Sequence, residues 1–279
     1  MNELREKTCV VTGAASGIGH ALATAFVEAG ARVVLADVDE SRLAESAEGL
    51  RRAGGDVLAV RTDVARAADV EQLAGRAWET FGAVHVVCNN AGVASDAPLW
   101  ESSLAEWEWM IGVNLWGVVH GIRAFVPRLL EQGVEAHVVN TASIAGLISE
   151  PGLGAYKATK HAVVSLSETL RHELALRRAP IGVSVLCPGF VRTRMADASA
   201  GAAPGAPRAR VDAAHRQALE HGMAPSVVAQ RTLAAIREDR FWIRTHTDWE
   251  GPIRTRALDV VDARDPATRT KPQAEERRT

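Results

Sequence analysis

One pair of side chains in this sequence has the types and the spacing needed for proton transfer. Tyr156 is the only tyrosine of the chain, and it lies four residues before Lys160 and thirteen after Ser143. Residues i and i+4 share a helix face, so the Lys160 ammonium group can lie beside the Tyr156 phenol. A nearby cation favours the phenolate, and we expect it to lower the pKa of Tyr156 towards neutrality. A phenol tuned in this way can act as a general acid–base.

A glycine-rich turn forms the second constellation. Thr12-Gly13-Ala14-Ala15-Ser16-Gly17-Ile18-Gly19 directly follows a strand-like run and opens a segment of helical periodicity. Glycines there allow a tight turn and close backbone approach, so amides at the helix N-terminus can face a pyrophosphate. The alternative is a tight turn without a ligand.

An acidic residue ends the second strand-like run. The carboxylate of Asp37 can accept hydrogen bonds from both hydroxyls of an adenosine ribose, and its charge would repel a ribose 2′-phosphate. The turn residues Ala14 to Ser16 carry no positive charge, and Arg42 should lie a turn inside the next helix. The sequence therefore favours NAD over NADP, and we interpret Asp39 as a solvated residue at a helix start.

These groups need a framework that brings them together. Short β-branched runs alternate with longer helix-patterned segments, which is typical of a parallel sheet covered by helices on both faces. The expected strands are residues 8–12, 32–37, 57–62, 84–89, 136–141, 183–187 and 241–244. The expected helices include residues 17–29, 41–53, 68–81, 104–130 and 155–176.

The same pattern predicts one α/β domain over residues 1–262, followed by a charged, flexible tail over residues 263–279. Residues 198–207 are rich in glycine, proline and alanine and show no periodicity. We interpret residues 194–222 as a mobile lid that closes over a substrate.

Composition excludes several classes of protein. The 279-residue chain has a formal net charge of −2, so no basic field attracts it to nucleic acid or to a membrane. The first apolar run is too short for a signal peptide, and no run approaches the length of a membrane span. Three separated cysteines in apolar runs indicate buried thiols in a reducing compartment, and we expect a cytoplasmic protein. No set of His, Cys and acidic residues has metal-site spacing, so no metal is expected.

At these motifs the chain resembles the short-chain dehydrogenase/reductase family, over roughly residues 5 to 246. The resemblance rests on the glycine turn at 12–19, on Asn89-Asn90-Ala91-Gly92, on Asn114, on Ser143, on Tyr156-Lys157-Ala158-Thr159-Lys160 and on Pro188-Gly189-Phe190-Val191-Arg192-Thr193, in the family's order. It implies a Rossmann-type, doubly wound sheet of seven parallel strands, a nicotinamide cofactor and hydride transfer to or from an alcohol or ketone.

The resemblance also implies residue roles. Tyr156 would be the general acid–base, Lys160 would lower its pKa and hold the nicotinamide ribose, Ser143 would bind the substrate oxygen, and Asn114 would hold a water connected to Lys160. The alternative for Asn114 is a structural role, as a polar residue tolerated in a helix because its amide is hydrogen-bonded to a carbonyl group. The residues expected to bind the cofactor, with Tyr156 and Lys160, are Gly13, Ser16, Gly17, Ile18, Asp37, Asp63, Val64, Asn90, Ala91, Gly92, Gly189, Val191 and Thr193.

Residues that follow these motifs are candidates for the substrate pocket, because ligands bind at the carboxyl ends of such strands. They are Val93, Ser95, Ile144, Leu147, Pro151, Leu153, Phe190, Met195 and Trp242. The set is mostly apolar, which favours a hydrophobic secondary alcohol or ketone, although Arg192 or Arg194 could face a carboxylate. We expect Trp107, Trp109 and Trp116 to be core or subunit-contact residues, and the resemblance implies a homodimer or homotetramer.

Two other functions stay open. One is an NADPH-dependent reductase of 3-oxoacyl thioesters or other carbonyl compounds, which Asp37 disfavours. The other is a dinucleotide-binding sensor or scaffold without catalysis, which the intact set of Asn114, Ser143, Tyr156 and Lys160 disfavours. A sister chemistry on the same fold, such as epimerisation, is a third alternative at the level of the fold alone.

Overall fold

The computed structural model describes residues 1, 3–195 and 212–266. Within them, seven strands form one parallel sheet in the order β3-β2-β1-β4-β5-β6-β7. The strands are β1 (Thr8–Thr12), β2 (Arg32–Asp37), β3 (Val57–Arg61), β4 (Val86–Asn89), β5 (Ala136–Thr141), β6 (Ile181–Cys187) and β7 (Trp242–Arg244). The chain runs outward from β1 to β3 and then returns to β4 on the other side of β1, so the direction of winding reverses between β1 and β4. Open α/β sheets bind ligands at such a switch point.

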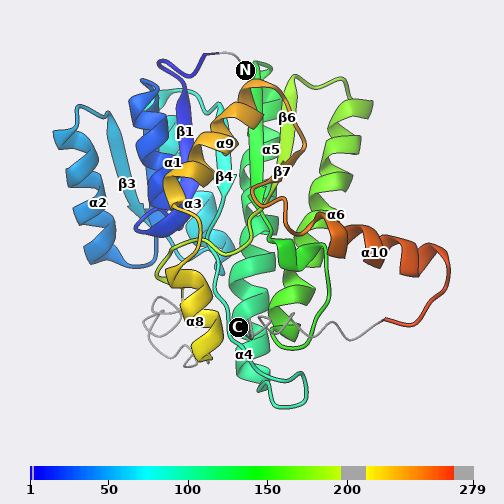
Figure 1. The fold of residues 1–279 in the computed structure, drawn as a ribbon. Coiled ribbons are helices and arrows are strands. Elements are labelled where there is room, and N and C mark those ends of the chain that lie inside the picture. Colours follow the sequence, from blue (N-terminus) through cyan, green and yellow to red (C-terminus); the bar gives the residue numbers. More distant parts are fainter. Residues whose placement is uncertain (2, 196–211, 267–279) are drawn as a thin grey trace, which may run out of the picture.

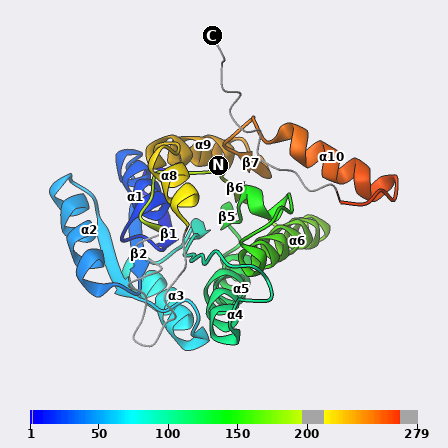
Figure 2. The same cartoon turned by 60° about the horizontal axis from the view of Figure 1, so that its bottom comes forward.

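Helices cover both faces of the sheet (Figures 1 and 2). α1 (Gly17–Glu28), α2 (Glu40–Arg52) and α9 (Pro225–Arg237) share one apolar cluster with Val11 and Leu35. α3 (Ala67–Phe81), α5 (Gly117–Gln132) and α6 (Gly154–Leu176) share a second cluster with Val10 and Val34. Successive residues of a strand point to opposite faces, which is why neighbours such as Val10 and Val11 enter different clusters. The predicted fold class is confirmed.

Most expected elements begin and end within two residues of the observed ones, and one expected helix differs. Residues 104–132 form α4 (Leu104–Met110), a π-helical segment (Ile111–Trp116) and α5 in sequence. By length and by its mean hydropathy of 1.2, this helical run could cross a membrane, but 44% of its apolar window is buried in the fold. It packs against the sheet beside α3 and α6 as a core helix.

Three helices were not anticipated. They are α8 (Ala213–Glu220), α9 and α10 (Glu250–Val261). α10 projects from the body of the protein in Figure 1 and has no buried residue. Of the predicted lid, residues 194, 195 and 212–222 are described and include α8, while residues 196–211 lie outside the described residues, as do residues 267–279 of the predicted tail. Cys9, Cys88 and Cys187 are buried free thiols, as predicted.

His137 is a buried titratable group at the start of β5, remote from the motifs. Its Nε2 lies 2.7 Å from the Ser184 hydroxyl, which itself donates to the Arg240 carbonyl. That hydroxyl has only one hydrogen, so His137 Nε2 must donate and Nδ1 is left as the unprotonated nitrogen of a neutral ring. Burial lowers the pKa of His137 to about 4, and the nearby Asp239 carboxylate only partly opposes this.

We therefore expect an acid-sensitive fold. Between pH 6.5 and about 4, His137 is protonated in the unfolded chain but neutral in the folded protein. The contribution of His137 to the free energy of unfolding is therefore fully present above pH 6.5 and is lost as the pH decreases through this window. The loss reaches about 3 kcal/mol, from about 1.36 kcal/mol for each unit of pKa. Urea unfolding from pH 7 to pH 4 should show this slope in the wild type and a flatter one in His137→Gln. The exposed His221 provides the control, His221→Gln, whose slope should match the wild type; an unchanged slope in His137→Gln would contradict the account.

Candidate active site

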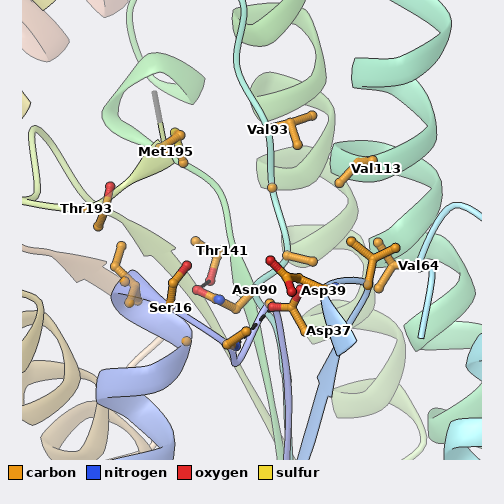
Figure 3. Close-up of a pocket in the computed structure, with 18 of the residues that line it drawn as sticks. Ser16, Asp37, Asp39, Val64, Asn90, Val93, Val113, Thr141, Thr193 and Met195 are labelled. Carbon is orange, nitrogen blue, oxygen red and sulfur yellow. Dashed lines mark hydrogen bonds between the residues drawn. The ribbon is translucent and has the colours of Figure 1, made fainter. Parts of the chain in front are cut away.

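The predicted site residues surround a cavity of about 290 Å³ at the carboxyl edge of the sheet (Figure 3). It extends from the β1–α1 turn and the end of β2, past the loop after β4, to α6 and the segment after β6. The structure brings most of the residues expected to bind a cofactor to this cavity. Those that line it are Gly13, Ser16, Gly17, Ile18, Asp37, Asp63, Val64, Asn90, Ala91, Gly92, Tyr156, Lys160 and Thr193.

The β1–α1 turn forms one wall by backbone alone. Gly13 has a φ of +66°, and a Cβ at this position would lie 2.9 Å from the Cα atom of Ala91. Any side chain would therefore clash with the neighbouring loop and strain the turn. Ser16 is the N-cap of α1, yet its side chain makes no capping hydrogen bond, and no acidic residue lies in the first turn of the helix. Backbone N–H groups at the start of α1 thus face the cavity without a protein anion, which suits a phosphate group.

Asp37 lies at the end of β2, on the opposite side of this turn. Its two carboxylate oxygens accept hydrogen bonds from the backbone N–H groups of Ala15 (3.0 Å) and Asp39 (3.1 Å). Burial raises the pKa of Asp37, and these hydrogen bonds oppose the shift. Each carboxylate oxygen can accept a second hydrogen bond, so the group remains able to bind ribose hydroxyls.

The two charged residues next to Asp37 in the cavity, Asp39 and Arg42, form an ion pair with each other. Asp39 is the N-cap of α2 and accepts a hydrogen bond from the Arg42 N–H, as its interpretation as a helix-start residue predicts. The Arg42 side chain lines the cavity, but its Nε atom lies 3.4 Å from Asp39 Oδ2. The arginine that could attract a 2′-phosphate therefore already has an anionic partner.

Asn90 joins three strands at the base of the cavity. Its amide nitrogen donates to the Thr12 carbonyl (2.9 Å), and its Oδ1 accepts from the Thr141 hydroxyl (3.4 Å). These bonds support a bracing role and leave its side chain little freedom. Asp63 accepts from the Ala65 N–H (3.0 Å), which orders the loop that carries Val64.

Tyr156 is the third residue of α6, and only 8% of its surface is exposed. Burial raises the pKa of Tyr156 to about 12, while the Ser143 hydroxyl partly opposes this by favouring the ionised phenol. The expectation that Lys160 draws the phenol's pKa towards neutrality is therefore wrong for this structure. Burial removes more solvation free energy from the phenolate than the polar groups around it replace.

Lys160 lies beside Tyr156, as the i, i+4 spacing predicts. Its Nζ atom is 5.5 Å from the centre of the Tyr156 ring and donates to the Thr141 carbonyl at 2.9 Å. Burial lowers the pKa of Lys160 to about 8, and the Cys187 thiol opposes the shift. The amine therefore remains mainly protonated at neutral pH and keeps two of its three hydrogens for other acceptors.

Ser143 lies within reach of the phenol but binds backbone groups. Its Oγ accepts from the Ala145 N–H (3.1 Å) and donates to the Pro188 carbonyl (3.3 Å). Binding a substrate oxygen would require the hydroxyl to turn away from Pro188. Ser143 is not among the described residues that line the cavity.

Asn114 lies in the π-helical segment and is fully buried. Its Oδ1 accepts from the Val93 N–H at 2.8 Å. Its Nδ2 donates to the Val93 carbonyl (2.9 Å) and to the Thr159 hydroxyl (3.2 Å), which uses both amide hydrogens. The amide group therefore clamps the loop after β4 and joins it to α6.

The expected substrate pocket is only partly assembled at this cavity. Val93 and Met195 line it. Ser95 does not, because its hydroxyl donates to the buried Glu106 carboxylate at 2.8 Å. Ile144 is buried, Leu147 packs against an apolar cluster that includes Val163 and Val185, and Phe190 meets His215 edge to face. Leu153 is the N-cap of α6, Pro151 is exposed, and Trp242 packs on Phe241 in the edge strand β7.

Only part of the segment after β6 reaches the cavity. Thr193 lines the cavity, whereas Gly189 and Val191 do not. The Gly189 N–H donates to His246 Nδ1 (3.0 Å), and Val191 is buried where it bridges to Met223. His246 therefore supports this segment, a role that no motif indicated.

Trp109 and Val113 are among the residues that line the cavity without having been assigned to the site. Trp109 and Val113 are four apart on the helix that carries Asn114, and both face the cavity. Trp109, which was expected to be a core or subunit-contact residue, packs against the apolar cluster that contains Tyr156 and also lines the cavity. Trp116 is half-exposed and stacks on His120 instead. No group of three potential metal ligands occurs among residues 1, 3–195 and 212–266.

Known proteins resemble this chain over nearly its whole length. The family model described as short chain dehydrogenase matches residues 7–202. A 1-deoxy-11-beta-hydroxypentalenate dehydrogenase of Streptomyces avermitilis is 41% identical over 260 residues, which cover 92% of this chain and 91% of that protein. A short chain dehydrogenase/reductase of Burkholderia phymatum, solved in complex with NAD, is 45% identical with a TM-score of 0.92, covering 97% of this chain and 99% of that one. This chain belongs to the short-chain dehydrogenase/reductase family of oxidoreductases.

Proposed function

We propose that the protein is an NAD-dependent dehydrogenase of an apolar secondary alcohol, or a reductase of the matching ketone, with Tyr156 as its general acid–base. One observation carries the proposal. The only phenol of the chain lies in the same cavity as an uncapped helix N-terminus and an acidic residue suited to a ribose.

The cavity fits a nicotinamide dinucleotide on several grounds. The turn at Gly13 leaves space that a Cβ would fill, and the Ser16 side chain does not cap the start of α1. Asp37 would hold the adenosine ribose, Asp63 and Val64 would flank the base, and Lys160 would bind the second ribose. Asp37 and the paired Arg42 favour NAD over NADP. The solved relative from Burkholderia phymatum contains NAD, which supports this choice.

When bound, the nicotinamide supplies the hydride chemistry of the reaction. The residues of the chain manage the proton and the substrate oxygen. In oxidation, the Tyr156 oxygen takes the hydroxyl proton of the alcohol, and in reduction the neutral phenol returns it. Lys160 stabilises the ionised phenol from one helical turn away. Ser143 turns its hydroxyl from the Pro188 carbonyl and donates its single hydrogen to the substrate oxygen. Because Asn114 clamps Val93, the wall that faces the substrate stays fixed during these steps.

The substrate side of the cavity favours an apolar molecule. Val93, Trp109 and Met195 belong to one cluster with Tyr156, and none of these side chains carries a charge. The relative from Streptomyces avermitilis is named as the dehydrogenase of a hydroxy compound, 1-deoxy-11-beta-hydroxypentalenate. We therefore place this chain's substrate among bulky alicyclic or aromatic secondary alcohols.

Trp109 is the largest side chain of that apolar wall, and its replacement should change which alcohols react. We expect Trp109→Leu to raise KM for bulky cyclic alcohols about tenfold, as the loss of up to about 1.5 kcal/mol of aromatic contact implies. KM for small acyclic alcohols and the Kd of NADH should stay unchanged. The measurement is NADH formation over a panel of secondary alcohols graded by size, with Trp116→Leu as the control.

Two outcomes of that panel would count against the account. If the wild type reduces NAD with no secondary alcohol, and oxidises NADH with no ketone, the proposed function fails. If Trp109→Leu weakens NADH binding and leaves KM unchanged, the tryptophan contacts the cofactor instead of the substrate.

A further inference from the structure

The catalytic helix begins without a cap of its own. α6 starts at Gly154, its N-cap residue Leu153 has no side-chain hydrogen bond to the helix, and its first turn contains no acidic residue. Leu153 also has a φ of +53°, a left-handed conformation that costs a residue with a Cβ about 1–2 kcal/mol. Such a conformation persists only where surrounding contacts hold it. Tyr156 lies in this first turn, so whatever holds Leu153 also places the phenol.

One carboxylate from a different loop supplies that contact. Asp96 lies in the segment between β4 and α4, and its Oδ1 accepts from the Leu153 N–H at 3.2 Å. The same oxygen lies so close to Gly152 that a Cβ there would be 2.8 Å away. Gly152, with a φ of +77°, is therefore required both for the turn and for the approach of Asp96. Asp96 therefore holds the N-cap residue of α6 from outside the helix.

Other contacts join the same two segments. Lys157 Nζ donates to the carbonyls of Glu150 and Gly152, so the turn before α6 is held from the helix side as well. Leu99, three residues after Asp96, packs so closely over Gly154 that a Cβ there would overlap it. The loop after β4 therefore wraps the start of α6 at two points, one polar and one apolar.

Asp96 also faces α8, which follows the segment after β6. The Nδ1 atom of His215 lies 4.0 Å from Asp96 Oδ2, and both side chains are mostly buried. His215 in turn meets Phe190 edge to face, with ring centres 5.4 Å apart. The carboxylate of Asp96, in the segment after β4, thus contacts two other segments, which follow β5 and β6.

We propose that Asp96 is a positioning residue, which fixes the start of α6 through Leu153 and so places the Tyr156 phenol for proton transfer. The proposal rests on the proposed function of Tyr156. Asp96 touches neither the cavity nor the reacting atoms among the described residues, and it acts through the backbone of the helix. Its carboxylate is needed as an acceptor, and its charge is secondary.

The test compares Asp96→Ala with Asp96→Asn. Removing the acceptor should lower kcat by at least about tenfold, because small misplacements of a catalytic group cost up to about 10² in rate. KM and the Kd of NADH should stay within about twofold, since Asp96 lies outside the cavity. Asp96→Asn keeps an oxygen that can accept from Leu153 and should recover most of kcat. The control is Asp56→Ala, which removes an exposed carboxylate that pairs only loosely with Arg32.

Rates are expressed per NADH-binding site, which separates misplacement from loss of folded protein. If Asp96→Ala does not fold, Gly152→Ala provides a second variant, because its methyl group would push the carboxylate away from Leu153. It should show the same loss of kcat with unchanged NADH binding. Wild-type activity per site in Asp96→Ala, or equal losses in the Ala and Asn variants, would overturn the positioning role. An inactive wild type would instead refute the proposed function.

Discussion

Tyr156→Phe should lose at least about 10³-fold in kcat, because general acid–base catalysis by a positioned group contributes about 10²–10⁴-fold. The change removes only the phenol oxygen and keeps the ring that packs against Val93 and Ala155. NADH should bind with nearly its original affinity, because Asp37, the β1–α1 turn and Lys160 remain in place. The measurement is the rate of NADH formation with the best alcohol of the panel, together with NADH binding followed by fluorescence.

Ser143→Ala provides a graded comparison for this variant. It removes a hydrogen bond to the substrate oxygen but no proton acceptor, so its loss should be smaller than that of Tyr156→Phe. A Tyr156→Phe enzyme with more than about one tenth of the wild-type kcat would exclude the phenol from general acid–base catalysis.

Asp37→Ser should reverse the preference for the cofactor. The loss of hydrogen bonds to a charged acceptor, worth about 1.5–3 kcal/mol, should weaken NADH binding by about ten- to a hundredfold. NADPH should bind more tightly than to the wild type, because the carboxylate that repels a 2′-phosphate is gone. Titration of each variant with NADH and with NADPH measures both effects.

The neighbouring ion pair refines this experiment. In the double variant Asp37→Ser/Asp39→Ser, Arg42 loses the carboxylate that lies 3.4 Å from its Nε atom. The affinity for NADPH should then rise further than in the single variant. The control variant, Asp56→Ser, should leave the affinities for NADH and NADPH unchanged. A wild type that binds NADPH more tightly than NADH would refute the role assigned to Asp37.

Much of the fold could be predicted from the sequence because its signals are local. Three expected strands, residues 8–12, 32–37 and 136–141, match the observed bounds, since buried β-branched runs in a parallel sheet differ clearly from amphipathic helices. The π-helical turn at residues 111–116 could not be predicted, because it depends on tertiary contacts such as those of Asn114 with Val93 and Thr159. α10 is equally hard to predict, because none of its residues is buried against the fold. Its sequence therefore needs no apolar stripe that would indicate a helix.

The candidate site likewise has a part that could be predicted from the sequence and a part that could not. Residues in motifs reach the cavity as predicted, Gly13 and Asp37 because they lie at strand ends and Lys160 because it shares a helix face with Tyr156. The apolar wall was less predictable, since a tryptophan on a helix is most often a core residue. Trp109 could have been found through Val113, which lies on the same helix face and directly precedes Asn114. The pKa of Tyr156 needed the structure, because burial outweighs the charge that the i, i+4 spacing places nearby.

The high pKa that burial gives Tyr156 leaves the bound nucleotide a role in ionising the phenol. The phenol holds its proton at neutral pH, since burial raises its pKa to about 12. Oxidised nicotinamide carries a positive charge, which would favour the phenolate in the same low-dielectric cavity. The proton would therefore leave the phenol readily only when the oxidised cofactor is bound.

A single chromophore makes this claim directly measurable. Tyr156 is the only tyrosine of the chain, so the ultraviolet difference absorbance of tyrosinate reports its ionisation alone. We predict that the protein without cofactor shows no tyrosinate signal up to about pH 10, and that saturating NAD brings the signal below that pH. Tyr156→Phe should show no signal in either state. Identical titrations with and without NAD, or ionisation near neutrality in the absence of NAD, would contradict the account.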